Sequence, residues 1–189
     1  MWTSPPGNLY CSTVLRPERE RGAWGQVSFV AAVAVAEAIG RAAPNVTPQL
    51  KWPNDVLVGA RKLAGILLEA SGDALVVGLG VNVASYPPGD GATSLARQGA
   101  EVTVEVLLSE AATTLLNWWQ RWEQHGFSVV RAAWLERAVG LGSEVEVRMA
   151  DETLSGTFEA LDETGALVLS GARRISAGDV VFGPVVSGA

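Results

Sequence analysis

The sequence predicts an α+β fold, in which a β-sheet flanked by helices is followed by a small β-barrel. Short apolar runs with strand character surround long helical patterns in the first 141 residues. From residue 142 onward the helical spacing disappears, and apolar and polar residues alternate instead. Tight turns divide this last segment into five short strands, which is the pattern of a small barrel. We therefore expect two domains, residues 1–141 and residues 142–189.

The first part of the chain is expected to contain a loop, a strand and a buried helix. Residues 1–8 read as a loop, because the Pro-Pro-Gly segment breaks both helices and strand ladders. Residues 9–15 (LYCSTVL) have the composition of a strand. Residues 26–43 are rich in Ala and Val and are apolar nearly all round. This pattern predicts a helix that is buried on more than one side.

Three strands and a long loop are expected next. The turn GARK separates two strands, residues 56–58 and 63–69. Residues 74–79 form a further apolar strand, which the segment VNV continues past two glycines. Residues 85–100 are rich in Pro and Gly and are expected to form a loop.

Two helices are expected to complete the first domain. Thr103 can cap a helix whose apolar residues recur at helical spacing. His125 and Gly126 end that helix with a basic residue and a C′ glycine. A shorter helix is expected over residues 128–138. We expect the tryptophans of these helices to lie in the core: Trp118, Trp119, Trp122 and Trp134.

Composition argues against several classes of protein. The 189 residues are 48% hydrophobic and 18% charged, as in globular proteins. No run of 18 or more apolar residues is present, so we expect no membrane partner. A net charge of −6 argues against a nucleic-acid partner. The single cysteine, Cys11, allows no intrachain disulfide and is typical of a reducing compartment, which predicts a cytoplasmic protein.

Common catalytic motifs are not found. The segment GLGVNV lacks the third glycine of a dinucleotide-binding fingerprint. His125 is the only histidine, and it lies at a helix end where the dipole favours a cation. Catalytic schemes that need a histidine beside Ser or Cys are therefore not expected. The same shortage argues against a His/Cys metal site.

The segment KWPND, residues 51–55, is the most unusual part of the sequence, and it has two interpretations. Pro53 fixes a turn and keeps Trp52 out of the α region, so a packed Trp with a solvated Lys51 would suffice. In the alternative, Lys51 and the basic pair Arg61–Lys62 hold an anionic ligand. Glycines within strands often mark the close approach of a ligand, and three interrupt the strands that follow: Gly65, Gly78 and Gly80.

The segment KWPNDVLVGARKLAGILLE, followed by GLGVNV, resembles the biotin–protein ligases, which biotinylate the carrier domains of carboxylases. The segment SPPGNLYCS resembles the same family's early strand. ALDETGALVL and ISAGDVVF resemble its C-terminal SH3-like domain. The resemblance covers nearly the whole chain in the right order. It implies a mixed β-sheet of the biotin/lipoate-ligase type flanked by helices, with a C-terminal SH3-like barrel.

The resemblance also implies an activity. Such a ligase activates biotin with ATP, accompanied by Mg²⁺, to biotinyl-5′-AMP, and then transfers biotin to a lysine of a biotin carboxyl carrier domain. Lys51 matches the motif lysine and is implied as the catalytic cation that holds charge developing on the phosphoryl oxygens.

Further residues are implied in binding. Lys62 is implied on the phosphate side, with a surface turn lysine as the alternative. Asn82 is implied in adenine contact, with a buried amide that bonds the backbone as the alternative. Trp2 is implied to stack on adenine. Space for biotin and its adenylate is implied at the glycines Gly65, Gly78 and Gly80.

One departure from the family concerns the start of the chain. The family's Gly/Arg-rich loop immediately precedes its counterpart of Trp2, and a strand that reads the biotin ureido ring comes earlier. This sequence starts at Met1 and contains neither segment. Either the true start lies further upstream, which we expect, or the chain is a remnant of such a ligase. We also expect the chain as given to bind biotin weakly and to associate with itself, as a homodimer, through an open sheet edge. Two other functions stay open: a non-catalytic binding or assembly module, and a ligase for a related acid such as lipoate.

Overall fold

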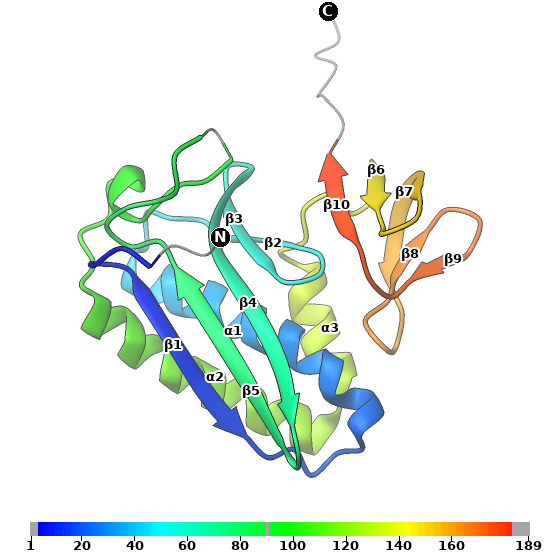
Figure 1. The fold of residues 1–189 in the computed structure, drawn as a ribbon, viewed down its shortest axis with the longest axis horizontal. Helices are drawn as coiled ribbons and strands as arrows, with labels where there is room; N and C mark the ends of the chain where they lie inside the picture. Colours follow the sequence, from blue (N-terminus) through cyan, green and yellow to red (C-terminus); the bar gives the residue numbers. More distant parts are fainter. Residues whose placement is uncertain (1–3, 90, 183–189) are drawn as a thin grey trace, which may run out of the picture.

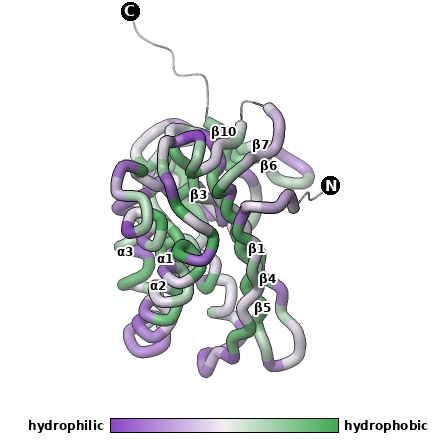
Figure 2. The backbone as a smooth tube through the Cα atoms, turned by 90° about the vertical axis from the view of Figure 1, so that its left-hand side faces the viewer, coloured by the Kyte–Doolittle hydropathy of each residue, from purple (hydrophilic) through white to green (hydrophobic). Residues whose placement is uncertain are grey.

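The computed structural model describes residues 4–89 and 91–182, which form two β-sheets and a layer of helices (Figure 1). The first sheet has the spatial order β1-β5-β4-β3-β2. Its strands are β1 (Leu9–Leu15), β2 (Gln49–Lys51), β3 (Asp55–Val58), β4 (Arg61–Ser71) and β5 (Ala74–Val81). Helices α1 (Val27–Ala42), α2 (Val104–His125) and α3 (Phe127–Leu135) cover one face of this sheet, as Figure 2 shows from the side. Two short 3-10 helices are η1 (Arg21–Gln26) and η2 (Ala96–Gln98).

The α+β class is confirmed, but the expectation of a mixed sheet is wrong for the strands that the structure describes. All pairings between β1, β2, β3, β4 and β5 are antiparallel. The reason lies in the connections, because short turns join β2, β3, β4 and β5 in succession, and strands joined in this way run antiparallel. The helical connection through α1 separates β1 from the others in sequence and leaves it at the edge, beside β5.

Helix α1 is the centre of the core. Eleven of its 16 residues are buried, as expected from a helix that is apolar nearly all round. The segment Arg21–Ala42 is long and apolar enough to cross a membrane by length and composition, yet 67% of its apolar window is buried inside the molecule. Its apolar character is therefore explained by contacts with the sheet and with the other two helices.

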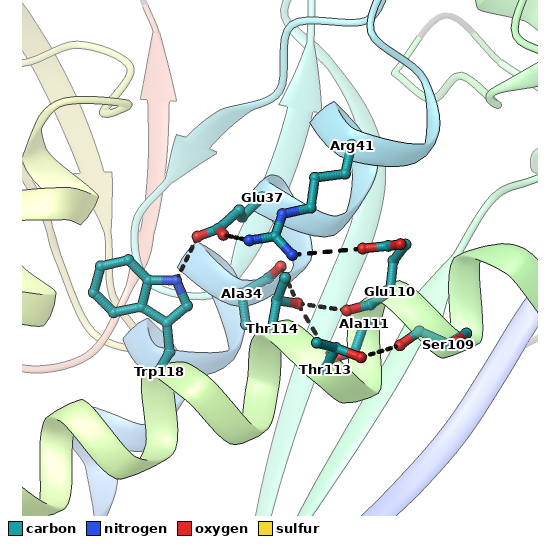
Figure 3. A network of polar contacts seen from close by, with 9 residues as sticks. All are labelled: Ala34, Glu37, Arg41, Ser109, Glu110, Ala111, Thr113, Thr114 and Trp118. Carbon is teal, nitrogen blue, oxygen red and sulfur yellow. Dashed lines mark hydrogen bonds and ion pairs between the residues drawn. The ribbon is translucent and has the colours of Figure 1, made fainter.

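Helix α2 is held on α1 by a set of polar contacts (Figure 3). Thr103 caps the helix, since its side chain accepts from the backbone N–H of Val106, as the sequence predicts. Trp118 Nε1 donates to Glu37 Oε2 at 2.7 Å, and Arg41 forms an ion pair with the same carboxylate. The predicted core position of the tryptophans is confirmed: Trp118, Trp122 and Trp134 are buried, and Trp119 is partly buried against them.

The five strands predicted after residue 142 are confirmed. They form a second antiparallel sheet in the order β10-β6-β7-β8-β9. Its pairing is irregular between Phe158 and Ala160, where β7 passes from its neighbour β6 to its neighbour β8. The strands are β6 (Glu144–Arg148), β7 (Thr153–Leu161), β8 (Leu167–Leu169), β9 (Arg173–Ile175) and β10 (Asp179–Phe182).

The second sheet shares its core with the helix layer. The ring of Phe158 on β7 lies 6.4 Å from that of Trp134 on α3, and Trp134 lies 5.6 Å from Phe29 on α1. Gly165, in the turn between β7 and β8, has a φ of +92°, and a Cβ there would lie 2.6 Å from the Phe29 ring. Its carbonyl accepts a 3.0 Å hydrogen bond from the buried indole of Trp52. The two sheets are therefore packed together through aromatic side chains and close backbone contact.

Candidate functional site

One transverse row of residues crosses the first sheet on the face away from the helices. The strand register pairs Lys51 with Asp55, Asp55 with Gly65, Gly65 with Gly80, and Gly80 with Tyr10. Residues paired directly across antiparallel strands project from the same face. The middle of the row is two adjacent glycines without side chains. A ligand on this face can therefore approach the backbone of the sheet closely.

Two adjoining hollows lie over this row. The larger, of about 780 Å³, is bordered by the loop residues 85–88, and the smaller, of about 590 Å³, reaches Gly78. Both volumes fall within the range of about 300–1,000 Å³ that is usual for small-molecule pockets. The two hollows share four residues of their lining: Tyr10, Lys62, Gly65 and Gly80.

Lys62 stands where the two hollows meet. Its Nζ lies 2.6 Å from Asp55 Oδ1, and the Asp55 side chain is only 15% exposed. The long loop returns to fix the Lys62 backbone, since Lys62 N donates to Gly91 O and Thr93 N donates to Lys62 O, both at 2.9 Å. A Cβ on Gly65 would lie 3.2 Å from Lys62 Cε and 3.3 Å from Nζ. The Lys62 side chain therefore lies across Gly65, which has no side chain to displace it.

The prediction that Lys62 belongs to a turn is wrong. The turn consists of Gly59 and Ala60, whose φ angles are +55° and +64°, and Lys62 is the second residue of β4. The turn is tighter than the sequence indicated, because Ala60 adopts the left-handed conformation that is more typical of glycine. The extra strand residues place the lysine beside Asp55, with its side chain still 46% exposed.

Lys51 is placed differently. It is the last residue of β2, and its Nζ donates to Asp179 Oδ1 on β10 at 2.8 Å. Its side chain is 17% exposed, and Lys51 is not among the described residues that border either hollow. Five of the predicted site residues border the hollows, and Lys51 lies outside them. The five are Lys62, Gly65, Gly78, Gly80 and Asn82.

The turn after Lys51 is firmly anchored. Trp52 is 2% exposed and precedes Pro53 through a cis peptide bond. Asn54 exchanges two hydrogen bonds with Ile66 on β4, from Asn54 Nδ2 to Ile66 O at 2.8 Å and from Ile66 N to Asn54 O at 3.0 Å. The packed tryptophan of the simpler interpretation is therefore present, while Lys51 is bound in an ion pair rather than solvated.

Two asparagines border the larger hollow. Asn82 follows β5, and its Nδ2 donates to Thr93 O at 3.0 Å, which is the backbone contact of the alternative interpretation. Asn8 was missed by the sequence analysis. Its Oδ1 accepts from three successive backbone N–H groups, residues 83–85, at 2.9–3.1 Å. Asn8 thereby fixes the loop that borders the hollow. The predicted contact of Trp2 lies outside the described residues.

Cys11 borders the smaller hollow from β1. The structure places Cys11 partly exposed and packed against the core. Burial raises the pKa of the Cys11 thiol, so the uncharged thiol is favoured over the thiolate.

Comparison with known proteins adds independent findings. Residues 1–136 match the model of the biotin/lipoate A/B protein ligase family, and residues 140–183 match that of the biotin protein ligase C-terminal domain. A biotin–[acetyl-CoA-carboxylase] ligase of Paracoccus denitrificans is 39% identical over 96% of this chain and 83% of its own length. A bifunctional ligase/repressor of Bacillus subtilis is 29% identical over 97% of this chain and 61% of its own length.

A solved structure with the same fold is similar over most of its length. The biotin protein ligase of Aquifex aeolicus, in complex with biotin and ATP, superimposes with a TM-score of 0.84 and 26% identity. The match covers 95% of this chain and 80% of that one. Together with the two family matches, this likeness shows that the chain belongs to the biotin/lipoate protein ligase family and has the C-terminal domain of the biotin protein ligases.

Proposed function

We propose that this chain is an ATP-dependent ligase that activates biotin to biotinyl-5′-AMP and transfers the biotinyl group to a lysine of a biotin carboxyl carrier domain. The observation that carries the proposal is the position of Lys62 where two hollows meet over a glycine floor. A ligase of this kind must bring two anions together, the carboxylate of biotin and the α-phosphate of ATP. A fixed ammonium between two adjoining sites reduces their repulsion.

The proposed first step joins a biotin carboxylate oxygen to the α-phosphorus, while the bond to pyrophosphate breaks. Lys62 is our choice for the cation that stabilises the phosphoryl oxygens, and Asp55 holds its ammonium in place. The floor of Gly65 and Gly80 lets the adenylate lie against the sheet backbone. Mg²⁺ is proposed to arrive with the phosphates of ATP, and Asn82 remains our candidate for contact with adenine.

In the proposed second step the acceptor amine attacks the acyl carbon, and AMP leaves with the electron pair of the broken bond. The family resemblance implied Lys51 as the principal cation. The ion pair with Asp179 and the position outside both hollows favour Lys62 for that role and a peripheral role for Lys51. We keep residues 1–141 as the proposed catalytic domain, and residues 142–189 as a proposed support for ATP use or acceptor docking.

The proposed partner is a carrier domain in the cytoplasm, and a homodimer is proposed along β1. In support of the dimer, β1 lies at the edge of its sheet and pairs with β5 alone among the described strands. Val14 on β1 is 57% exposed. Replacing Val14 by Lys should shift light-scattering mass toward the monomer, because charge on an edge strand opposes pairing.

The experiment that tests the function supplies biotin at millimolar concentration with ATP and Mg²⁺, and measures pyrophosphate release. A carrier domain is then added, and its mass is determined. Lipoic acid in place of biotin is the matched control for the related ligase activity. Pyrophosphate release with lipoate but not biotin would assign the chain to that activity instead. No release with either acid would favour a binding or assembly module.

A further inference from the structure

The chain contains very few lysines. Of its 14 basic residues, 12 are arginines and only two are lysines, Lys51 and Lys62. Both lysines lie at the candidate site: Lys51 belongs to the transverse row, and Lys62 lies beside its residue Asp55. The other twelve basic positions are arginines, including Arg61, which precedes Lys62 on β4, and Arg121 on α2. A guanidinium stays protonated at all ordinary pH values, whereas a lysine can act as a nucleophile once it loses its proton.

Both lysine ammonium groups are bound by carboxylates. Lys62 Nζ lies 2.6 Å from Asp55 Oδ1, and Lys51 Nζ lies 2.8 Å from Asp179 Oδ1. An amine attacks an acyl group through its lone pair, which the ammonium form does not have. Each carboxylate attracts the ammonium beside it and opposes its loss of a proton, although one member of each pair is well exposed, Lys62 at 46% and Asp179 at 65%.

The remaining strong nucleophile beside the hollows is Cys11. The thiolate is its reactive form, and burial raises the pKa of this thiol. The two lysines and the cysteine are therefore each held in a less reactive state, the lysines by ion pairs and the cysteine by burial.

We propose that Asp179 withholds Lys51 from acylation, so that the acyl-adenylate made in this site keeps its biotinyl group for an external amine. This inference rests on the proposed function. In the reaction that is avoided, the Lys51 amine would attack the acyl carbon of biotinyl-5′-AMP. An amide bond would form, the bond from the acyl carbon to the phosphate oxygen would break, and AMP would leave while the amine lost a proton.

Lys51 is the lysine at risk because of its place in the sheet. It is paired directly with Asp55, which borders the smaller hollow, so the released side chain could swing toward the adenylate. The restraint comes from a different sheet, since Asp179 begins β10, where its pairing with Arg148 on β6 fixes its position. Through Asp179, the C-terminal sheet thus helps to determine which amine receives the biotinyl group.

The test supplies biotinyl-5′-AMP directly to the 189-residue chain without an acceptor, and follows labelling by intact mass and peptide mapping. The wild-type chain should stay unlabelled at Lys51 and Lys62. Asp179→Ala should label Lys51 at least tenfold faster than the wild type. Asp179→Asn keeps an acceptor oxygen without the charge and should label at an intermediate rate, and it replaces the alanine variant if that variant fails to fold.

Two charge-conserving variants serve as matched controls, because each adds one lysine. Arg61→Lys places an amine on the site's sheet, at the first residue of β4 and directly before Lys62, and should be labelled at residue 61. Arg121→Lys places it on α2, behind the sheet, and should be labelled far more slowly. Equal labelling of both, or no gain at Lys51 in Asp179→Ala, would overturn the inference. Pyrophosphate release from biotin and ATP tests the proposed function separately, because the labelling experiment does not depend on that step.

Discussion

Gly65→Ala tests whether the site depends on the passage of the Lys62 side chain over a bare backbone. The added Cβ would lie 3.2 Å from Lys62 Cε and 3.3 Å from Nζ. Ordinary contacts between such atoms are about 3.5–4.0 Å, so the ammonium must move by about 0.2–0.7 Å. A misplacement of about 1 Å in a catalytic site can cost about 10²-fold. We therefore expect kcat/KM for adenylate formation to fall roughly tenfold.

The same substitution should not weaken the fold. The end of a lysine side chain is flexible and moves at low cost, and glycine within a strand is destabilising by about 0.5–1 kcal/mol relative to alanine. The free energy of unfolding in urea should therefore stay constant or rise slightly. A stable but less active variant is the distinctive expectation.

The assay compares pyrophosphate release with urea unfolding for Gly65→Ala and a control, Gly40→Ala. A Cβ at Gly40 on α1 meets no atom within 4 Å, so the control should keep its activity. Activity of Gly65→Ala within twofold of wild type would refute the argument. So would a loss of activity that matches a loss of stability, since the cause would then be the fold.

The remaining predictions concern four other positions. Lys62→Ala should slow adenylate formation about 10²–10³-fold, and Lys51→Ala by a smaller factor; the reverse ranking in a pyrophosphate assay would return the principal role to Lys51. Gly165→Ala should lower the free energy of unfolding by about 3 kcal/mol, because its Cβ would lie 2.6 Å from Phe29 at a φ of +92°, and calorimetry measures this. Burial alone would raise the pKa of Asp162, but its hydrogen bonds lower that pKa overall. The carboxylate therefore stabilises the fold above its unfolded pKa of about 3.9, and this contribution is lost as pH falls through the lower folded pKa. Urea titrations should thus show that Asp162→Asn is destabilising at neutral pH and much less so in acid.

Local patterns in the sequence predicted most of the elements. Helix α2 and the five strands after residue 142 follow from periodicity, helix α1 follows from its Ala- and Val-rich composition, and the cap at Thr103 follows from its residue type. The position of the turn before Lys62 was missed, because a left-handed Ala60 is not indicated by its residue type. Lys62 then lies beside Asp55 because its side chain crosses Gly65, the residue that the register pairs with Asp55.

Contacts between distant parts of the chain could not be predicted in the same way. Lys51 and Asp179 are 128 residues apart, and no local pattern indicates that they form an ion pair. The three hydrogen bonds that Asn8 accepts come from residues 75–77 positions away. Residue type alone predicted that a ligand can approach the backbone closely at Gly65, Gly78 and Gly80. Their contact with biotin stays a prediction.

The contact between Gly165 and the Trp52 indole has a consequence for protein engineering. The β7–β8 turn reaches into the helix layer where a single added carbon would collide with Phe29. The C-terminal sheet therefore cannot be exchanged freely between related proteins. Consider a chimaera joined near residue 141, with the last sheet taken from another ligase. It should express as stable protein only when the donated sheet has a glycine at this turn and the recipient domain has aromatic residues at the positions of Trp52 and Phe29.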